Sequence, residues 1–167
     1  MAAPPFKIQG FAMCGVGSKI YVIGGVFPGF KYSNEVHIYD IKRDEWTRGP
    51  DYPVLAAYKG SGMAATVVGS NIYANGFGGG VYKLDTIENQ WGETDVELKQ
   101  SRIYHRLASF NDQLLLFIGG RSNRAATDSV ETIDISGINI IQDNTSSEFD
   151  IEHYISTYKD SQKGSST

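Results

Sequence analysis

The chain has 167 residues, of which 41% are hydrophobic and 12% aromatic, and this is enough for one domain with a real core. Its net charge is −4 and its pI is about 5.3, so it lacks the basic surface of a nucleic-acid-binding protein. No segment approaches the ~18 apolar residues that a membrane span needs, and the first residues lack the apolar run of a signal peptide. We therefore expect no nucleic-acid or membrane partner, and a cytoplasmic location with a nuclear one as the alternative.

A short lead-in at residues 1–10 precedes three units at about 11–50, 61–98 and 105–141. Each unit begins with a stretch rich in small residues, as in 11–16, followed by an almost unbroken apolar run that leads into a glycine, as in 19–25. A third segment alternates apolar and polar residues, and a fourth follows a polar turn. This pattern predicts four short strands in each unit.

The spacing between the units is nearly constant. The third predicted strand ends at Asp40, Asp85 and Asp134, so the units repeat after 45 and 49 residues, and Trp46 and Trp91 each follow their aspartate by six residues. A period of ~40–50 residues is typical of β-propeller blades.

The tail at residues 142–167 is rich in Ser, Asp and Lys and departs from the repeat. This composition predicts a disordered tail. Its scattered apolar residues leave two alternatives open, a short amphipathic helix or a linear docking motif.

The three units resemble the Kelch repeat, in which two glycines follow an apolar strand, a Tyr-Asp pair ends the next strand and a Trp comes about six residues later. The first unit matches in full. In the second, Phe77 and Leu84 replace a glycine and the tyrosine, and in the third Ile133 and Ile140 stand at the Tyr and Trp positions. The resemblance implies structural roles for Gly24, Gly25, Tyr39, Asp40, Trp46, Asp85, Trp91, Gly119, Gly120 and Asp134.

The resemblance implies an all-β fold of blades with four antiparallel strands each. Propellers close with ~4–8 blades, so three blades form an incomplete ring with an uncovered face at each end. Two explanations remain open: the chain is part of a longer propeller, or it forms a homodimer in which a second copy completes the ring. We expect the tryptophan of each fourth strand to pack onto the next blade.

Few side chains are candidates for catalysis. Cys14 is the only cysteine, and no two histidines stand at metal-ligand spacing, so we expect no metal and no cofactor. His105 lies in the stretch 102–108, which resembles the Arg-x-x-His-x-x-Ala sequence that leads into a Kelch blade, and this implies a structural role. The glycines at 78–80 are not followed by the Lys-Ser/Thr of a phosphate loop.

The sequence favours a non-catalytic protein-protein interaction module. Aromatic and arginine side chains in the loops that follow the glycine pairs and precede the first strands are the residue types that dominate binding surfaces, and a guanidinium group suits an acidic peptide. The candidate partner-binding residues are Phe30, Tyr32, Tyr58, Arg102, Tyr104, Arg106, Arg121 and Arg124. The resemblance implies substrate recognition for a ubiquitin ligase or actin-associated scaffolding. The alternatives are a sugar-modifying, epimerase-like enzyme and a truncated isoform without independent function.

Overall fold

The computed structural model describes residues 1–53 and 60–141. In these residues the regular structure consists of β-strands, and the all-β expectation is confirmed. Across the same residues there is no helix with the length and apolar character needed to span a bilayer.

The first blade is a four-stranded antiparallel sheet. It consists of β1 (Ala12–Val16), β2 (Lys19–Phe27), β3 (Lys31–Asp40) and β4 (Glu45–Arg48), in that order. The register of β2 against β3 shifts between Ile23 and Gly25. Gly25 has φ +116, and a Cβ there would lie 2.7 Å from the Ile8 side chain and 2.9 Å from the Gln9 carbonyl oxygen. The glycine therefore lets the residues before β1 pass close to this bulge.

The second blade has the same four strands and one more. Its strands are β5 (Ala64–Val68), β6 (Asn71–Asn75), β7 (Gly80–Asp85) and β8 (Gln90–Glu97), and β14 (Ile140–Ile141) adds to the outer edge of β8.

The third blade has three strands in place of the expected four. These are β9 (Arg106–Phe110), β10 (Leu114–Ile118) and β13 (Val130–Asp134), while β11 (Arg121–Ser122) and β12 (Ala125–Ala126) form a separate small hairpin between β10 and β13.

The expectation that Ile140 lies on a fourth strand of the third unit is wrong. Asn139 instead bonds to Asp95 of the second blade, donating from its backbone N–H and its side-chain Nδ2 and accepting from the Asp95 N–H. Ile140 packs against Gly92, where a Cβ would lie 2.5 Å from the Ile140 Cγ2 atom. Because Gly92 has no side chain, Ile140 can pack against it and β14 can pair with β8.

The three aspartates of the repeat stabilise equivalent turns. The Oδ1 atom of Asp40 accepts from two backbone N–H groups, those of residues 42 and 43, and Asp85 accepts in the same way from residues 87 and 88. Asp134 accepts from the N–H and the hydroxyl of Ser136. These bonds lower the pKa of Asp85 and of Asp134 because they stabilise the charged carboxylate.

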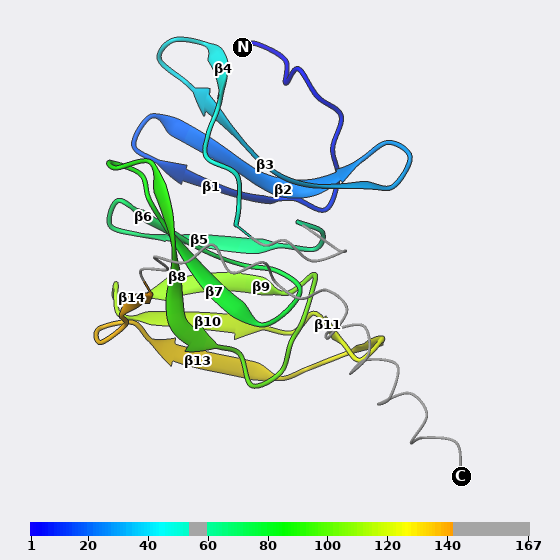
Figure 1. Cartoon of the computed structure of the whole chain (residues 1–167), viewed down its shortest axis with the longest axis vertical. Helices are drawn as coiled ribbons and strands as arrows, with labels where there is room; N and C mark the ends of the chain where they lie inside the picture. Colours follow the sequence, from blue (N-terminus) through cyan, green and yellow to red (C-terminus); the bar gives the residue numbers. More distant parts are fainter. Residues whose placement is uncertain (54–59, 142–167) are drawn as a thin grey trace.

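The sheets stack face to face, as blades do, with the inner strands β1, β5 and β9 side by side (Figure 1). Two apolar clusters join them. One contains Tyr21, Val36 and Leu84 and lies between the first and second blades, and the other contains Tyr73, Leu115 and Phe117 and lies between the second and third. The core is therefore made of interfaces between blades, because no single blade can bury both of its faces.

The tryptophans pack toward the preceding side of their blades, and not onto the next blade as expected. Trp91 donates from Nε1 to the Pro50 carbonyl at 3.0 Å, and its ring meets Tyr52 edge-on at 5.2 Å between centroids. Pro50 and Tyr52 belong to the segment that leaves the first blade. Trp46 makes the equivalent contacts with the N-terminal residues, donating to the Ala2 carbonyl and meeting Phe6 edge-on at 5.3 Å.

Candidate functional site

One side of the stacked sheets carries most of the predicted binding residues. The loop between β2 and β3 and the β11–β12 hairpin both project on the right of Figure 1, opposite the turn between β3 and β4. We call this side the loop face and define it by the residues 27–32, 103–104 and 121–126.

The β2–β3 loop presents an aromatic ring to solvent. Phe30 is 82% exposed, and it has φ +59 directly after Gly29 at φ +80. Two left-handed residues in succession form the tight turn and direct the Phe30 side chain outward. Tyr32 is exposed on the strand that follows.

A shallow cavity of about 270 Å³ lies beside this ring. Its wall consists of the loop residues and the segment before β1, namely Lys7, Ile8, Gln9, Val26, Phe27, Pro28, Gly29 and Phe30. The lining combines apolar side chains with one exposed ammonium group, that of Lys7.

The β11–β12 hairpin presents two arginines. Its tip has left-handed backbone at Asn123 and Arg124, and Arg121 Nη2 donates to the Arg124 carbonyl at 2.9 Å. Tyr104, which is also exposed and left-handed, lies next to Arg121 because Ile103 and Arg121 form a two-way backbone bridge. The structure thus brings together three of the predicted residues at one corner of the loop face.

The arginines of this hairpin differ from three of the four other arginines in the described residues. Arg43, Arg48 and Arg102 each form an ion pair with a carboxylate. Among residues 1–53 and 60–141, no ion pair involves Arg121 or Arg124. Both are therefore cations without a carboxylate partner in this part of the chain.

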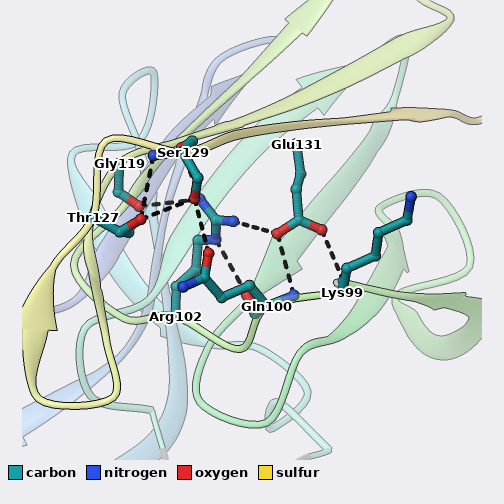
Figure 2. Close-up of polar contacts among 7 residues, drawn as sticks. All are labelled: Lys99, Gln100, Arg102, Gly119, Thr127, Ser129 and Glu131. Atoms are coloured by element: carbon teal, nitrogen blue, oxygen red, sulfur yellow. Dashed lines mark hydrogen bonds and ion pairs between the residues drawn. The ribbon is translucent and has the colours of Figure 1, made fainter.

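The expectation that Arg102 is an exposed binding residue is wrong, because this residue is 1% exposed. Figure 2 shows its guanidinium between two segments of the third blade, where it donates to the carbonyl oxygens of Gly119 and Ser129 and pairs with Glu131. Glu131 also accepts from the backbone N–H of Lys99 at 2.8 Å. This network fastens the connector from the second blade to β13, so Arg102 is a structural residue.

Two other predicted residues do not join the loop face. Arg106 is exposed, but it begins β9 and shares the outer face of the third blade with Ile118, its partner across the strands. Tyr58 lies outside the described residues, as do all residues of the tail from 142 onward.

His105 and Cys14 are unsuited to acid-base or nucleophilic work in this arrangement. His105 is fully buried, and burial lowers its pKa to about 4, with smaller contributions from Arg102 and Arg106. Burial raises the pKa of the Cys14 thiol to about 12, which leaves it protonated and unreactive at neutral pH. Within the described ranges, no three His, Cys, Asp or Glu side chains are grouped to hold a metal ion.

Sequence reasoning missed two structural side chains. Glu131 holds the position that His37 has in the first unit and Tyr82 in the second, and both of these carry a ring. The repeat therefore gave no signal for a carboxylate with this role. Phe6 lies in the predicted lead-in and received no role there. It stands 40 residues before Trp46, nearly the 39 residues that separate Tyr52 from Trp91.

The comparisons with known proteins agree with this geometry. The Kelch motif matches residues 9–51. The putative protein tag-53 of Caenorhabditis elegans is 26% identical over 139 residues, which cover 76% of this chain and 10% of that protein. The solved structure of YjhT superposes with a TM-score of 0.65 at 19% identity and covers 83% of this chain and 47% of that one. The chain thus spans about a tenth of the length of its curated relative and about half of the similar structure.

Proposed function

Because this chain is an incomplete β-propeller of the Kelch-repeat type, we propose that it is a non-catalytic module that recognises another protein through the loop face. The observation that carries the proposal is the pair of exposed arginines on the β11–β12 hairpin, which form no ion pair within the described residues. Exposed loops on a rigid sheet scaffold are common sites of recognition.

The chemistry of the loop face favours an acidic peptide segment with an apolar side chain. Two guanidinium groups bind carboxylates with charge-assisted hydrogen bonds. Phe30 and the adjacent cavity offer an apolar contact, and exposed aromatic rings contribute strongly to binding energy.

A labelled peptide with alternating glutamates and one phenylalanine tests this proposal by fluorescence polarisation. The double variant Arg121→Ala/Arg124→Ala removes two charge-assisted contacts, each worth about 1.5–3 kcal/mol, so we expect affinity to fall at least about a hundredfold. Lys42→Ala/Arg43→Ala is the matched control, because it removes two exposed cations from the turn at the opposite end of the sheets.

Equal loss of affinity in the control variant would mean that the peptide responds only to net charge, and would contradict the proposal. A second peptide, with lysine in place of each glutamate, should bind neither protein.

We further propose that the partner is a substrate delivered to a ubiquitin ligase or a cytoskeletal protein, the two roles implied by the Kelch resemblance. Both roles place the chain in the cytoplasm. Co-sedimentation with filamentous actin separates them, because only the scaffolding role predicts that the chain pellets and that the double arginine variant pellets less.

A further inference from the structure

We propose that two copies of this chain form a closed ring of six blades, in which the outer face of the third blade of each copy packs on the outer face of the first blade of the other. This contact would repeat the interface that joins the blades within the chain. Of the loop face it uses only the backbone carbonyl of Tyr104.

The first argument is the burial of equivalent positions. Val36 and Val81 begin the regular part of the third strand in the first two blades, and both are 0% exposed because the next blade covers them. Val130 holds the same position in the third blade and is 56% exposed. Ile118 is 44% exposed, whereas Ile23, its equivalent in the first blade, is fully buried. The third blade therefore carries the side chains of a blade interface without a blade upon them.

The first blade carries the opposite half of the same interface. Ala65 and Leu107 occupy equivalent positions on the inner strands β5 and β9, and each packs into the cluster shared with the preceding blade. Met13 is their equivalent on β1, and it is 61% exposed. Phe11 is likewise exposed, although its equivalents Met63 and His105 are buried. The third blade lacks a covering blade, and these exposed side chains belong to a blade face of the kind that covers its neighbour.

A series of backbone hydrogen bonds runs from blade to blade and ends unfinished on both sides. Gly62 donates its N–H to the Gly10 carbonyl at 3.0 Å, and Tyr104 donates to the Gly62 carbonyl at 2.8 Å. The three residues share left-handed backbone, with φ +65, +65 and +58. Within the described residues the N–H of Gly10 and the carbonyl of Tyr104 have no backbone partner. In the proposed ring, Gly10 of one copy donates to Tyr104 of the other and completes the series.

The N-terminal residues leave room for this contact. Phe6 packs on His37 and Trp46 in the manner in which Tyr52 packs on Tyr82 and Trp91. Since Tyr52 lies at the outer part of an interface that is closed by blades, Phe6 covers only the outer part of the first blade's face. The inner part, with Met13, remains open.

The number of blades and the length of a related structure favour a second copy as the occupant. Rings of ~4–8 blades are the known closed propellers, and two sets of three fall within this range. The match covers 47% of the YjhT chain, so two copies together have about the length of that structure. A head-to-tail contact closes only if the rotation per copy is half a turn, and three blades of six provide it.

The test is the solution mass of the full chain, measured by light scattering coupled to size exclusion. We expect twice the chain mass of 18.3 kDa. Met13→Asp and Ile118→Asp each place a buried charge in both contacts of the ring, and each should give a monomer. Ile87→Asp is the matched control, because Ile87 is an exposed isoleucine in a turn away from both faces, and this variant should remain a dimer.

Mixing the two monomeric variants distinguishes the head-to-tail contact from a symmetric one. The mixture contains one intact pair of faces, the third blade of Met13→Asp and the first blade of Ile118→Asp, so we expect an open dimer to form again. A monomeric wild type would overturn the proposal. A dimer that survives Met13→Asp would also overturn it, since it would join the two third blades to each other. Circular dichroism of each variant shows that the monomers are folded.

Discussion

The buried ring of His105 should make this protein less stable in acid. The ring is fully buried, and neither ring nitrogen has a hydrogen-bond partner among the described residues. Burial and two nearby arginines lower its pKa from 6.5 to about 4. Because the folded state binds the proton less tightly than the unfolded state, the contribution of His105 to stability is present in full above pH 6.5. It is lost progressively as the pH falls to 4.

A difference of this size corresponds to about 3 kcal/mol over the whole interval, since each pKa unit is worth about 1.4 kcal/mol. Urea unfolding at pH 7.5 and pH 4.5 measures it, at one fixed protein concentration. We expect the wild type to lose about 2.5 kcal/mol more than His105→Phe, which keeps a ring against Phe117 but cannot titrate. Carboxylates contribute equally to both proteins and cancel. Equal losses of the free energy of unfolding in the two proteins would contradict the inference that His105 is neutral in the folded state.

Three further predictions concern single contacts. Arg102→Met should lower the free energy of unfolding by about 3–5 kcal/mol because it leaves Glu131 without its cation, whereas Arg43→Met, in an exposed turn, should change it by less than about 1 kcal/mol; urea titration checks both. Gly60→Ala should prevent folding, since its Cβ would lie 1.7 Å from the Ser33 carbonyl oxygen, while Gly17→Ala, equally left-handed but with no atom within 4 Å, should cost only about 1–2 kcal/mol; circular dichroism distinguishes them. Phe6→Ala should cost about 1–2 kcal/mol and shift the fluorescence of Trp46 to longer wavelength in a Trp91→Phe background.

The strands and their order in the first two blades follow from the sequence because local and global signals agree there. The apolar run 19–25 is buried along most of its length, and the alternating segment that ends at Asp40 pairs on both sides. In the third unit the signals conflict. Ile140 stands at the spacing of a tryptophan, yet a small residue at position 92 on another blade gives it a better site. Contacts between distant segments of this kind are invisible to periodicity.

The candidate site was predictable in part. Phe30 and Arg121 each follow a glycine, and such glycines mark turns in a sequence. Both residues are exposed, and both glycines have left-handed backbone. Arg102 is the instructive failure, since an arginine in a loop is more often exposed than buried. Its burial depends on Glu131, 29 residues later, together with two carbonyl oxygens of the same blade. Only the folded register brings these four groups together.

The pairing of Phe6 with Trp46 shows that the repeating unit includes the connector before each blade. The two rings are 40 residues apart in sequence, and Tyr52 and Trp91 are 39 apart. His37 and Tyr82 each stand nine residues before their tryptophan and contact the connector ring, His37 tilted against Phe6 and Tyr82 edge-on to Tyr52. Both indole groups donate to a carbonyl of the connector, that of Ala2 or that of Pro50. Residues 2–6 therefore act as the connector of the first blade, and they keep its tryptophan packed without a preceding blade among the described residues. On the inner strand β1 the exposed side chain of Met13 remains, and a further blade would cover it.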